Sequence, residues 1–455
     1  RRVDLNQSKA VSFAGDIITQ LKSFGRWLLQ TAPSDILEFM SPRVAEDVAD
    51  LLESLIRLCF VSDMRVFIAQ KTSKVRSVFN GPQAINLTQP NRLIQKMLRD
   101  VGVVELVLDL VVIPFVEKGV TTENVRLNPD YNGFNVVAER SYAVLRAMMI
   151  DNHLNKSYIA RYIGWFTLPL SSEICQLGTR METVSTLIEL FSENTALLSN
   201  VHVETIKLFT DVLLEDFRFP RFVKFLAVLC SCRDQPIKEN QNQILDLLST
   251  PEQRKALMQA RVVPIDDKKR SGKLASYDIE VFWQGAGQAR FGDSGSFFLS
   301  QMREKTKQVA NAKESDLPPQ LLAYKFFIEQ MLLFIALLRG RNNAAFQFFT
   351  EHAEDYGIQY KTLLKVLTNE NMPFVYREIC VKVLHSLFLD QEPQVAVDLM
   401  RSVRYRHQYP SEDSAEEQHG DGDLSRSATL RGAGGIAAAP VVGKTRSLSD
   451  IDLLA

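Results

Sequence analysis

Apolar residues recur three and four positions apart in segment after segment of the chain, and strict alternation of apolar and polar residues is almost absent. Between Val44 and Phe60 the apolar stripe consists of Val48, Leu51, Leu52, Leu55, Ile56 and Cys59. Residues with this spacing lie on one face of an α-helix, which can then be buried against a neighbour. The pattern therefore predicts an all-α fold.

Further stripes predict a series of helices joined by short polar segments. These helices are expected near residues 9–30, 91–116, 136–165, 180–198, 201–217, 220–232, 239–258, 318–339, 342–352, 357–369, 373–389 and 393–404. Pro220 supports one of the predicted starts, because its fixed φ angle and missing N–H suit the first turn of a helix. Successive helix pairs favour an armadillo- or HEAT-like superhelix over a compact bundle, although no regular sequence period is present.

Two segments interrupt the helical pattern. Residues 261–316 are rich in Gly, Ser, Lys and Asp and are expected to form a long flexible loop. Residues 406–455 contain too few large apolar side chains to offset the entropy lost on ordering, so this tail is expected to be disordered. A chain of 455 residues also exceeds the size of one growing hydrophobic core, which favours several units or one extended solenoid.

Charge and composition limit the possible functions. The 53 basic residues nearly cancel the 54 acidic ones, so a global attraction to nucleic acid or anionic membranes is absent and any anion site must be local. The five cysteines are mostly embedded in apolar helical stretches, which indicates buried thiols in a reducing cytosol. No apolar run reaches the roughly 18 uninterrupted residues of a spanning helix. Because the chain begins with Arg1 and not with methionine, we expect an internal piece of a longer product.

One local cluster of cations stands out. Arg92, Lys96 and Arg99 are four and three residues apart in a predicted helix that Pro90 or Asn91 would start, so all three project from one face. Convergent cations of this kind can bind phosphate groups through charge-assisted hydrogen bonds. The alternative is an ordinary solvated basic face, which is common on surface helices.

The motifs that suggest catalysis or metal binding are incomplete. Cys230 and Cys232 have no second Cys or His pair nearby in sequence, as a structural zinc site requires. Residues 292–296 resemble a serine-protease nucleophile motif, but those enzymes need a β-barrel scaffold and this chain is predicted to be helical outside its loops. Residues 443–445 resemble the end of a phosphate-binding loop, yet Ala438 stands where that loop needs glycine. We therefore predict no enzyme, no bound metal and no cofactor.

Several stretches, in order, resemble the cytosolic core of inositol trisphosphate receptors and, more distantly, ryanodine receptors, and together they cover most of residues 10–405. Ala45–Glu53 followed by Pro90–Arg99 is similar to the helical half of the ligand-binding core in that family. The most specific stretches resemble the homology domain shared by both channel classes: Pro220–Leu226, Leu229–Cys232 and Ile237–Ile244.

The resemblance implies a domain division along the chain. Its parts are a helical ligand-binding-core-like region at 1–170, receptor homology domain helices at 171–260, the loop at 261–316, continuing helical repeats at 317–405 and the tail at 406–455. The family's β-trefoil half of the ligand site and its pore helices are not found among these residues. Binding of inositol trisphosphate by this piece alone is therefore expected to be weak or nil.

The resemblance also assigns roles to individual residues. Arg92, Lys96 and Arg99 match basic residues that contact the ligand phosphates in that family. A second basic pair of the family falls here on His153 and Leu154, so the sequence departs from the pattern at this place. Lys156 is a candidate substitute for this missing charge.

We therefore expect a cytosolic regulatory or coupling segment of an intracellular ligand-gated calcium-release channel. By resemblance, the channel is a homotetramer at the endoplasmic reticulum or a similar calcium-store membrane, with an inositol phosphate as ligand and calcium as permeant or regulatory ion. No nucleic-acid partner and no transmembrane segment are expected in this chain. The alternative is a soluble armadillo-type scaffold that binds protein partners on its concave face and has no channel activity.

Overall fold

The computed structural model describes residues 5–32, 35–36, 40–61, 89–120, 132–167, 177–215, 219–264, 277–283, 295–305, 314 and 317–390. The N-terminal helices are α1 (Leu5–Gln30), α3 (Pro42–Leu58), α5 (Arg92–Asp100), α6 (Val103–Val112), the π-helix η2 (Ile113–Glu117), α8 (Asn132–Met149), α9 (His153–Ile159), the 3-10 turn η4 (Ala160–Tyr162) and α10 (Ile163–Thr167). They are followed by α11 (Leu177–Phe191), α12 (Thr195–Leu198), α13 (Val203–Glu215), α14 (Pro220–Leu229), α15 (Lys238–Leu248) and α16 (Pro251–Arg254). The last helices are the 3-10 turn η6 (Leu299–Met302), α18 (Pro319–Leu338), α19 (Asn343–Glu351), α20 (Tyr360–Thr368), α21 (Phe374–Leu384) and the π-helix η8 (His385–Leu389).

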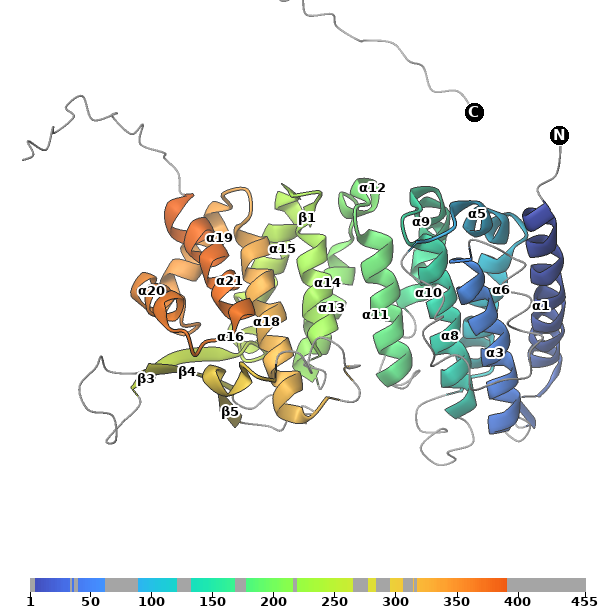
Figure 1. Ribbon diagram of the computed structural model, residues 1–455, viewed down its shortest axis with the longest axis horizontal. Coiled ribbons are helices and arrows are strands. Elements are labelled where there is room, and N and C mark those ends of the chain that lie inside the picture. The colour runs from blue at the N-terminus through green and yellow to red at the C-terminus, as the bar shows by residue number, and fades with distance from the viewer. Residues whose placement is uncertain are drawn as a thin grey trace, which may run out of the picture. The chain divides into compact units, whose positions relative to one another are not determined.

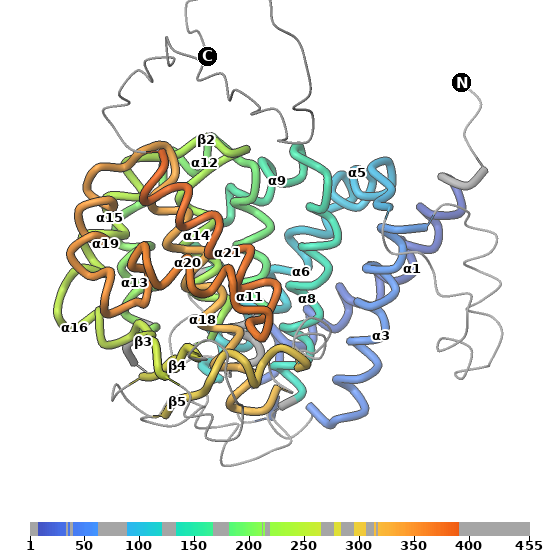
Figure 2. Tube along the Cα trace, turned by 60° about the vertical axis from the view of Figure 1, so that its left-hand side comes forward, coloured from blue at the N-terminus to red at the C-terminus, as the bar shows by residue number. Residues whose placement is uncertain are grey.

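The helices of residues 1–394 form two layers (Figures 1 and 2). One layer runs in chain order, each helix packing against the next: α3, α8, α11, α14, α18 and α21. The second layer covers it, with α1 and α6 on the N-terminal helices and α13, α15 and α19 on the later ones. The predicted all-helical, armadillo- or HEAT-like superhelix is confirmed for this described part of the chain.

Local sequence explains where individual helices begin. The Ser41 side chain accepts a hydrogen bond from the Val44 N–H at the start of α3. At the start of α5, the Asn91 side chain accepts from the N–H groups of Leu93 and Ile94. Pro220 opens α14, as the sequence predicts. In the α3 stripe, the side chains of Val48, Leu52, Leu55 and Cys59 are buried, and those of Leu51 and Ile56 are partly buried.

Two segments that were predicted as single helices are broken in the structure. The segment 91–116 contains α5 and α6, separated at Gly102, whose φ angle of 82° lies in the left-handed region that glycine adopts without steric cost. The segment 136–165 breaks after Met149, where Asp151 has a φ angle of 54° and Asn152 caps the next helix, α9. Apolar periodicity continues across both breaks, so it did not reveal these changes of direction.

The helix α18 forms the centre of the C-terminal half. Among the described residues it is the one helix long and apolar enough to cross a membrane by length and composition alone, and 78% of its most apolar window is buried inside the structure. The buried Gln330 side chain lies within this helix, donating to the Met258 carbonyl at 2.8 Å and accepting from the Met258 N–H at 2.8 Å. Burial of this kind is typical of a core helix in a large helical domain.

The segment 261–316, predicted as a loop, contains strands in its described parts, so that prediction was wrong for them. An antiparallel sheet joins β3 (Gln259–Pro264), β4 (Tyr277–Trp283) and β5 (Gly295–Phe298) in that order, with Gln259 opposite Phe282 and Glu280 opposite Phe298. Ile279, Val281 and Trp283 alternate on the buried face of β4, a short period-two signal within a polar, glycine-rich segment. A smaller hairpin pairs β1 (Ser231–Cys232) with β2 (Gln235–Pro236).

Gly295 in β5 allows a close approach to the neighbouring strand. A Cβ atom at this position would lie 2.5 Å from Cζ2 of Trp283, which is closer than real carbon contacts. The predicted helix at 393–404 and the predicted tail at 406–455 lie outside the described residues.

Candidate functional site

Helix α5 carries three of the predicted ligand residues. Arg92 and Lys96 are exposed, and neither makes a hydrogen bond or ion pair with a described residue. Arg99, in the last turn, is mostly covered by its neighbours. Ile94, Gln95 and Leu98 are the buried side chains of α5, so the basic side chains remain on its outer side.

A buried amide network fixes α5 against α8 and α9. Gln95 Nε2 donates to the carbonyl oxygens of Ala147 at 2.8 Å and Ile150 at 3.0 Å, at the end of α8. In return, Asn155 Nδ2 donates to the Gln95 carbonyl at 3.0 Å, and Asn152 Nδ2 donates to Gln95 Oε1 at 3.0 Å. Because unpaired amides would be costly in this buried position, α5 cannot shift without disturbing the end of α8.

The Arg99 guanidinium makes hydrogen bonds within the protein but does not use all of its N–H donors. Its Nε and Nη2 donate to Asp100 Oδ1 at 3.1 and 2.9 Å, and its Nη1 donates to Asn155 Oδ1 at 3.1 Å. Its central carbon also lies 5.8 Å from the centroid of the Tyr158 ring. A guanidinium has five N–H donors, so Arg99 can still donate to an anion.

Lys156 does not join the cations of α5. Its Nζ lies 2.8 Å from Glu189 Oε1 and donates to the Ser192 carbonyl at 3.1 Å, so it is directed toward α11. Only 11% of its side chain is exposed. His153 and Leu154 are exposed at the start of α9. The structure therefore gives Lys156 a counter-charge on α11, whereas Arg92 and Lys96 have none among the described residues.

The structure instead brings Arg161 to this region, a residue to which the sequence assigned no role. The Arg161 guanidinium carbon lies 5.2 Å from the centroid of the same Tyr158 ring that Arg99 approaches. The 3-10 turn η4, directly after α9, places Arg161 there. Residues three apart in a helical segment are neighbours, so the spacing from Tyr158 to Arg161 was the available signal.

Glu105 of α6 holds the Tyr158 ring in place. Its Oε1 accepts hydrogen bonds from the hydroxyls of Tyr158 and Tyr162, the latter at 2.7 Å. Burial alone would raise the pKa of Glu105, but the two hydroxyl donors outweigh burial and lower it. The ionised carboxylate therefore fixes the aromatic ring to which both arginines are adjacent.

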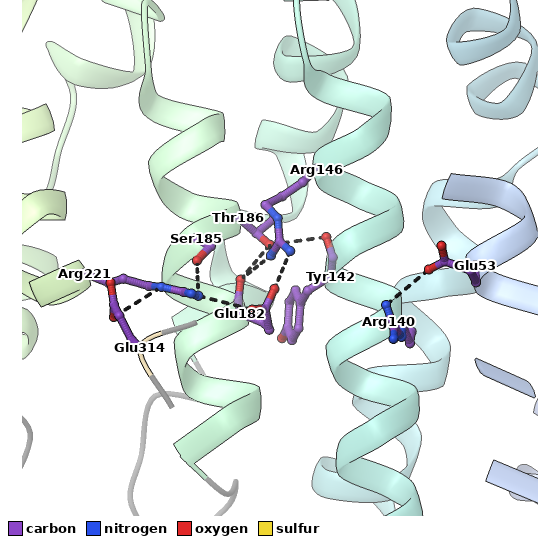
Figure 3. Close-up of polar contacts among 9 residues, drawn as sticks. All are labelled: Glu53, Arg140, Tyr142, Arg146, Glu182, Ser185, Thr186, Arg221 and Glu314. Carbon is purple, nitrogen blue, oxygen red and sulfur yellow. Dashed lines mark hydrogen bonds and ion pairs between the residues drawn. The ribbon is translucent and has the colours of Figure 1, made fainter. Parts of the chain in front are cut away.

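A second group of polar contacts joins the helices of the first layer (Figure 3). Glu182 of α11 forms ion pairs with Arg146 of α8 and, through Oε1, with Arg221 Nη1 of α14 at 3.2 Å. The Arg221 Nη1 also donates to Ser185 Oγ at 2.6 Å. Burial would raise the pKa of Glu182, but the charges of Arg146 and Arg221 outweigh burial and lower it. One carboxylate thus joins three successive helices.

This series of ion pairs continues in both directions. Arg221 Nε lies 3.4 Å from Glu314 Oε2, and Lys325 Nζ of α18 lies 3.2 Å from Glu314 Oε1, with only 4% of the Glu314 side chain exposed. Toward the N-terminus, Arg140 Nη1 of α8 donates to Glu53 Oε2 of α3 at 3.2 Å. Ion pairs therefore connect α3, α8, α11, α14 and α18.

The described cysteines are buried thiols, and the remaining sequence motifs lie partly outside the described residues. Cys59, Cys230, Cys232 and Cys380 are free and buried, and burial raises the pKa of the Cys59 thiol to about 12. Among the described residues, no group of three or more His, Cys, Asp or Glu side chains could hold a metal ion. The residues 443–445 and the first three of 292–296 lie outside the described part.

Residues 58–262 match the family model of the RIH domain, the homology domain of ryanodine and inositol trisphosphate receptors. This match agrees with the resemblance that the sequence showed. The matched model describes a receptor homology domain and not an enzyme.

A curated protein with a similar sequence bears the name of an inositol trisphosphate receptor-like protein. The "Inositol 1,4,5-trisphosphate receptor-like protein A" of Dictyostelium discoideum is 23% identical to this chain over 253 residues. The matched region is 56% of this chain and 7% of that protein, so the chain corresponds to a small share of its relative's length.

Proposed function

We propose that this chain is a cytosolic regulatory segment of an intracellular, ligand-gated calcium-release channel related to the inositol trisphosphate receptors. The single observation that carries the proposal is the RIH domain match over residues 58–262. The name of the Dictyostelium relative points to the same class of receptor. In this proposal the channel is a homotetramer in the endoplasmic reticulum or a similar calcium-store membrane.

The ligand is captured by the basic residues of α5. Arg92 and Lys96 offer exposed cations without counter-charges among the described residues, and Arg99 retains free N–H donors. Cations arranged on one helix face suit a small molecule with several phosphate groups. Because Gln95 ties α5 to the end of α8, a shift of α5 on ligand binding is passed to α8.

The ion pairs of α8 pass such a shift along the layer. Moving α8 alone would separate Arg146 from Glu182 and Arg140 from Glu53. Separation of the partly buried pair would leave uncompensated charges, which is strongly unfavourable. The helices joined by Glu182 and Glu314 therefore tend to move together, as a segment that couples two distant sites requires.

The test is calcium release by the full-length gene product in cells that lack other inositol trisphosphate receptors. We expect inositol trisphosphate to release stored calcium, and Arg99→Gln to weaken ligand binding by about 1–3 kcal/mol. Glu182→Gln should reduce release while ligand affinity stays unchanged, because Glu182 lies outside the binding region. Arg43→Gln, which changes an exposed arginine of α3, is the control. Absence of any ligand-dependent release would contradict the proposal.

An exposed apolar surface favours a second candidate, a protein-binding scaffold without channel activity. Helices α20 and α21 pack against each other and both expose large apolar side chains, the most exposed being Phe374 at 76%. A partner that binds the chain, is lost with Phe374→Asp and is indifferent to inositol phosphates would support this candidate. Partner binding that requires inositol trisphosphate would favour the channel instead.

A further inference from the structure

Arg161 is an exposed cation. Among the described residues it has no counter-charge and makes no hydrogen bond, and its guanidinium lies over the face of the Tyr158 ring. It lies on η4, a turn of three residues held between α9 and α10. A free arginine in a defined backbone position is available to bind an anion.

The second cation, Arg99, is brought to the same aromatic ring from a different part of the chain. Both guanidinium carbons lie within 6 Å of the Tyr158 centroid, at 5.2 and 5.8 Å, so they are at most about 11 Å apart. The hydrogen bond from the Tyr158 hydroxyl to Glu105 holds the outer end of the ring in place. The two guanidinium groups therefore share one fixed aromatic neighbour.

The charge balance on this surface is positive. Arg99 pairs with Asp100, which is itself 51% exposed and therefore neutralises Arg99 only weakly. Glu105 is turned toward the two tyrosine hydroxyls. Arg92 and Lys96 of α5 add two more exposed cations. Exposed cations with few counter-charges attract a polyanion.

We infer that Arg161 and Arg99, which both lie at the Tyr158 ring, form a phosphate-binding pair. In this pair, Arg161 replaces the positive charge that His153, Leu154 and the ion-paired Lys156 do not supply. The inference rests on the proposed function and adds to it a residue that determines which ligands bind. Two guanidinium forks held at one ring select a ligand with at least two phosphate groups over one with a single phosphate.

Titration calorimetry measures binding of inositol 1,4,5-trisphosphate to the full-length gene product. Inorganic phosphate is titrated in the same way as the comparison with a single phosphate group. Arg161→Gln should weaken binding of the trisphosphate about tenfold, as for the loss of one charge-assisted interaction. Arg161→Lys, which keeps the charge and loses the fork, should have an intermediate effect. Arg43→Gln is the matched control, since Arg43 is also exposed and without a recorded partner among the described residues.

Each outcome decides between the inference and the proposed function. If Arg99→Gln weakens binding while Arg161→Gln binds like Arg43→Gln, the inference is wrong and the proposed function stands. If the unmodified protein binds no inositol phosphate, both are wrong. Arg161 is exposed, so its variants should keep the wild-type melting temperature, and a lower one would mean that it acts in folding instead.

A parallel assay distinguishes the source of the phosphates. Vesicles of phosphatidylcholine with and without phosphatidylinositol 4,5-bisphosphate are sedimented with the protein. Binding of the soluble trisphosphate alone identifies a free ligand. Binding to the phosphoinositide vesicles that Arg161→Gln abolishes identifies a lipid headgroup at the same pair of arginines.

Discussion

Glu182 Oε1 on α11 lies 3.2 Å from Arg221 Nη1 on α14, and the same carboxylate pairs with Arg146 on α8. Its side chain is 24% exposed, so solvent screens these interactions only in part. Neighbouring helices of a superhelix usually contact each other pairwise, whereas this single side chain joins three of them. Disruption of Glu182 should therefore affect the contacts of three helices at once.

We expect Glu182→Gln to lower the free energy of unfolding by about 1–3 kcal/mol, because it leaves Arg146 without its carboxylate and Arg221 with Glu314 alone. Urea unfolding followed by circular dichroism measures the change. Glu378→Gln is the control, because Glu378 pairs with Lys382 on the surface of α21 and should cost less than about 0.5 kcal/mol. Equal effects of the two substitutions would show that the position of Glu182 between helices contributes nothing.

Stability should depend on pH through the same carboxylate. The pKa of Glu182 is lower in the folded protein than its ordinary value of 4.5, so the folded state favours the ionised form. Its contribution is complete above pH 4.5 and is lost as the pH falls through the lower pKa of the folded state. The difference in unfolding free energy between wild type and Glu182→Gln should therefore shrink between neutral pH and pH 3. A difference independent of pH would contradict this assignment.

Lys156 should prove structural and not part of the ligand site. Lys156→Met removes the ion pair with Glu189 and the hydrogen bond to the Ser192 carbonyl, so the free energy of unfolding should fall by about 1–3 kcal/mol. Affinity for inositol trisphosphate should remain within twofold of wild type. A tenfold loss of affinity with unchanged stability would instead restore Lys156 as a ligand residue.

Gly295→Ala should destabilise the sheet. The added Cβ would meet the ring of Trp283 at 2.5 Å, and a forced repacking of this kind costs about 1–3 kcal/mol. Gly15→Ala provides the contrast, since nothing lies within 4 Å of the added atom in the middle of α1. There the substitution should stabilise the protein by about 0.5–1 kcal/mol. Melting temperatures of the two variants should move in opposite directions.

The sequence by itself determined the helical class and most of the helices. The α3 stripe of Val48, Leu52 and Leu55 is buried as its spacing predicts, because a period of 3.6 residues is a local property of the chain. The Asn91 cap of α5 and the first residue of α14, Pro220, act within one turn and could also be predicted from the sequence. The resemblance to the receptor family was also visible in the sequence, since it depends on residue types in order.

The tertiary structure decided which of the basic residues come together. Lys156 is one residue from Asn155, yet Asn155 contacts Arg99 while Lys156 pairs with Glu189 of α11. Arg161 lies three residues after Tyr158 on the same helical segment, whereas Arg99 reaches this ring only because α5 packs against α9. Strands β4 and β5 are stabilised by pairing with each other, and each strand alone lacks these hydrogen bonds. Contacts of this kind depend on how separate elements pack, and no local pattern of residues contains that information.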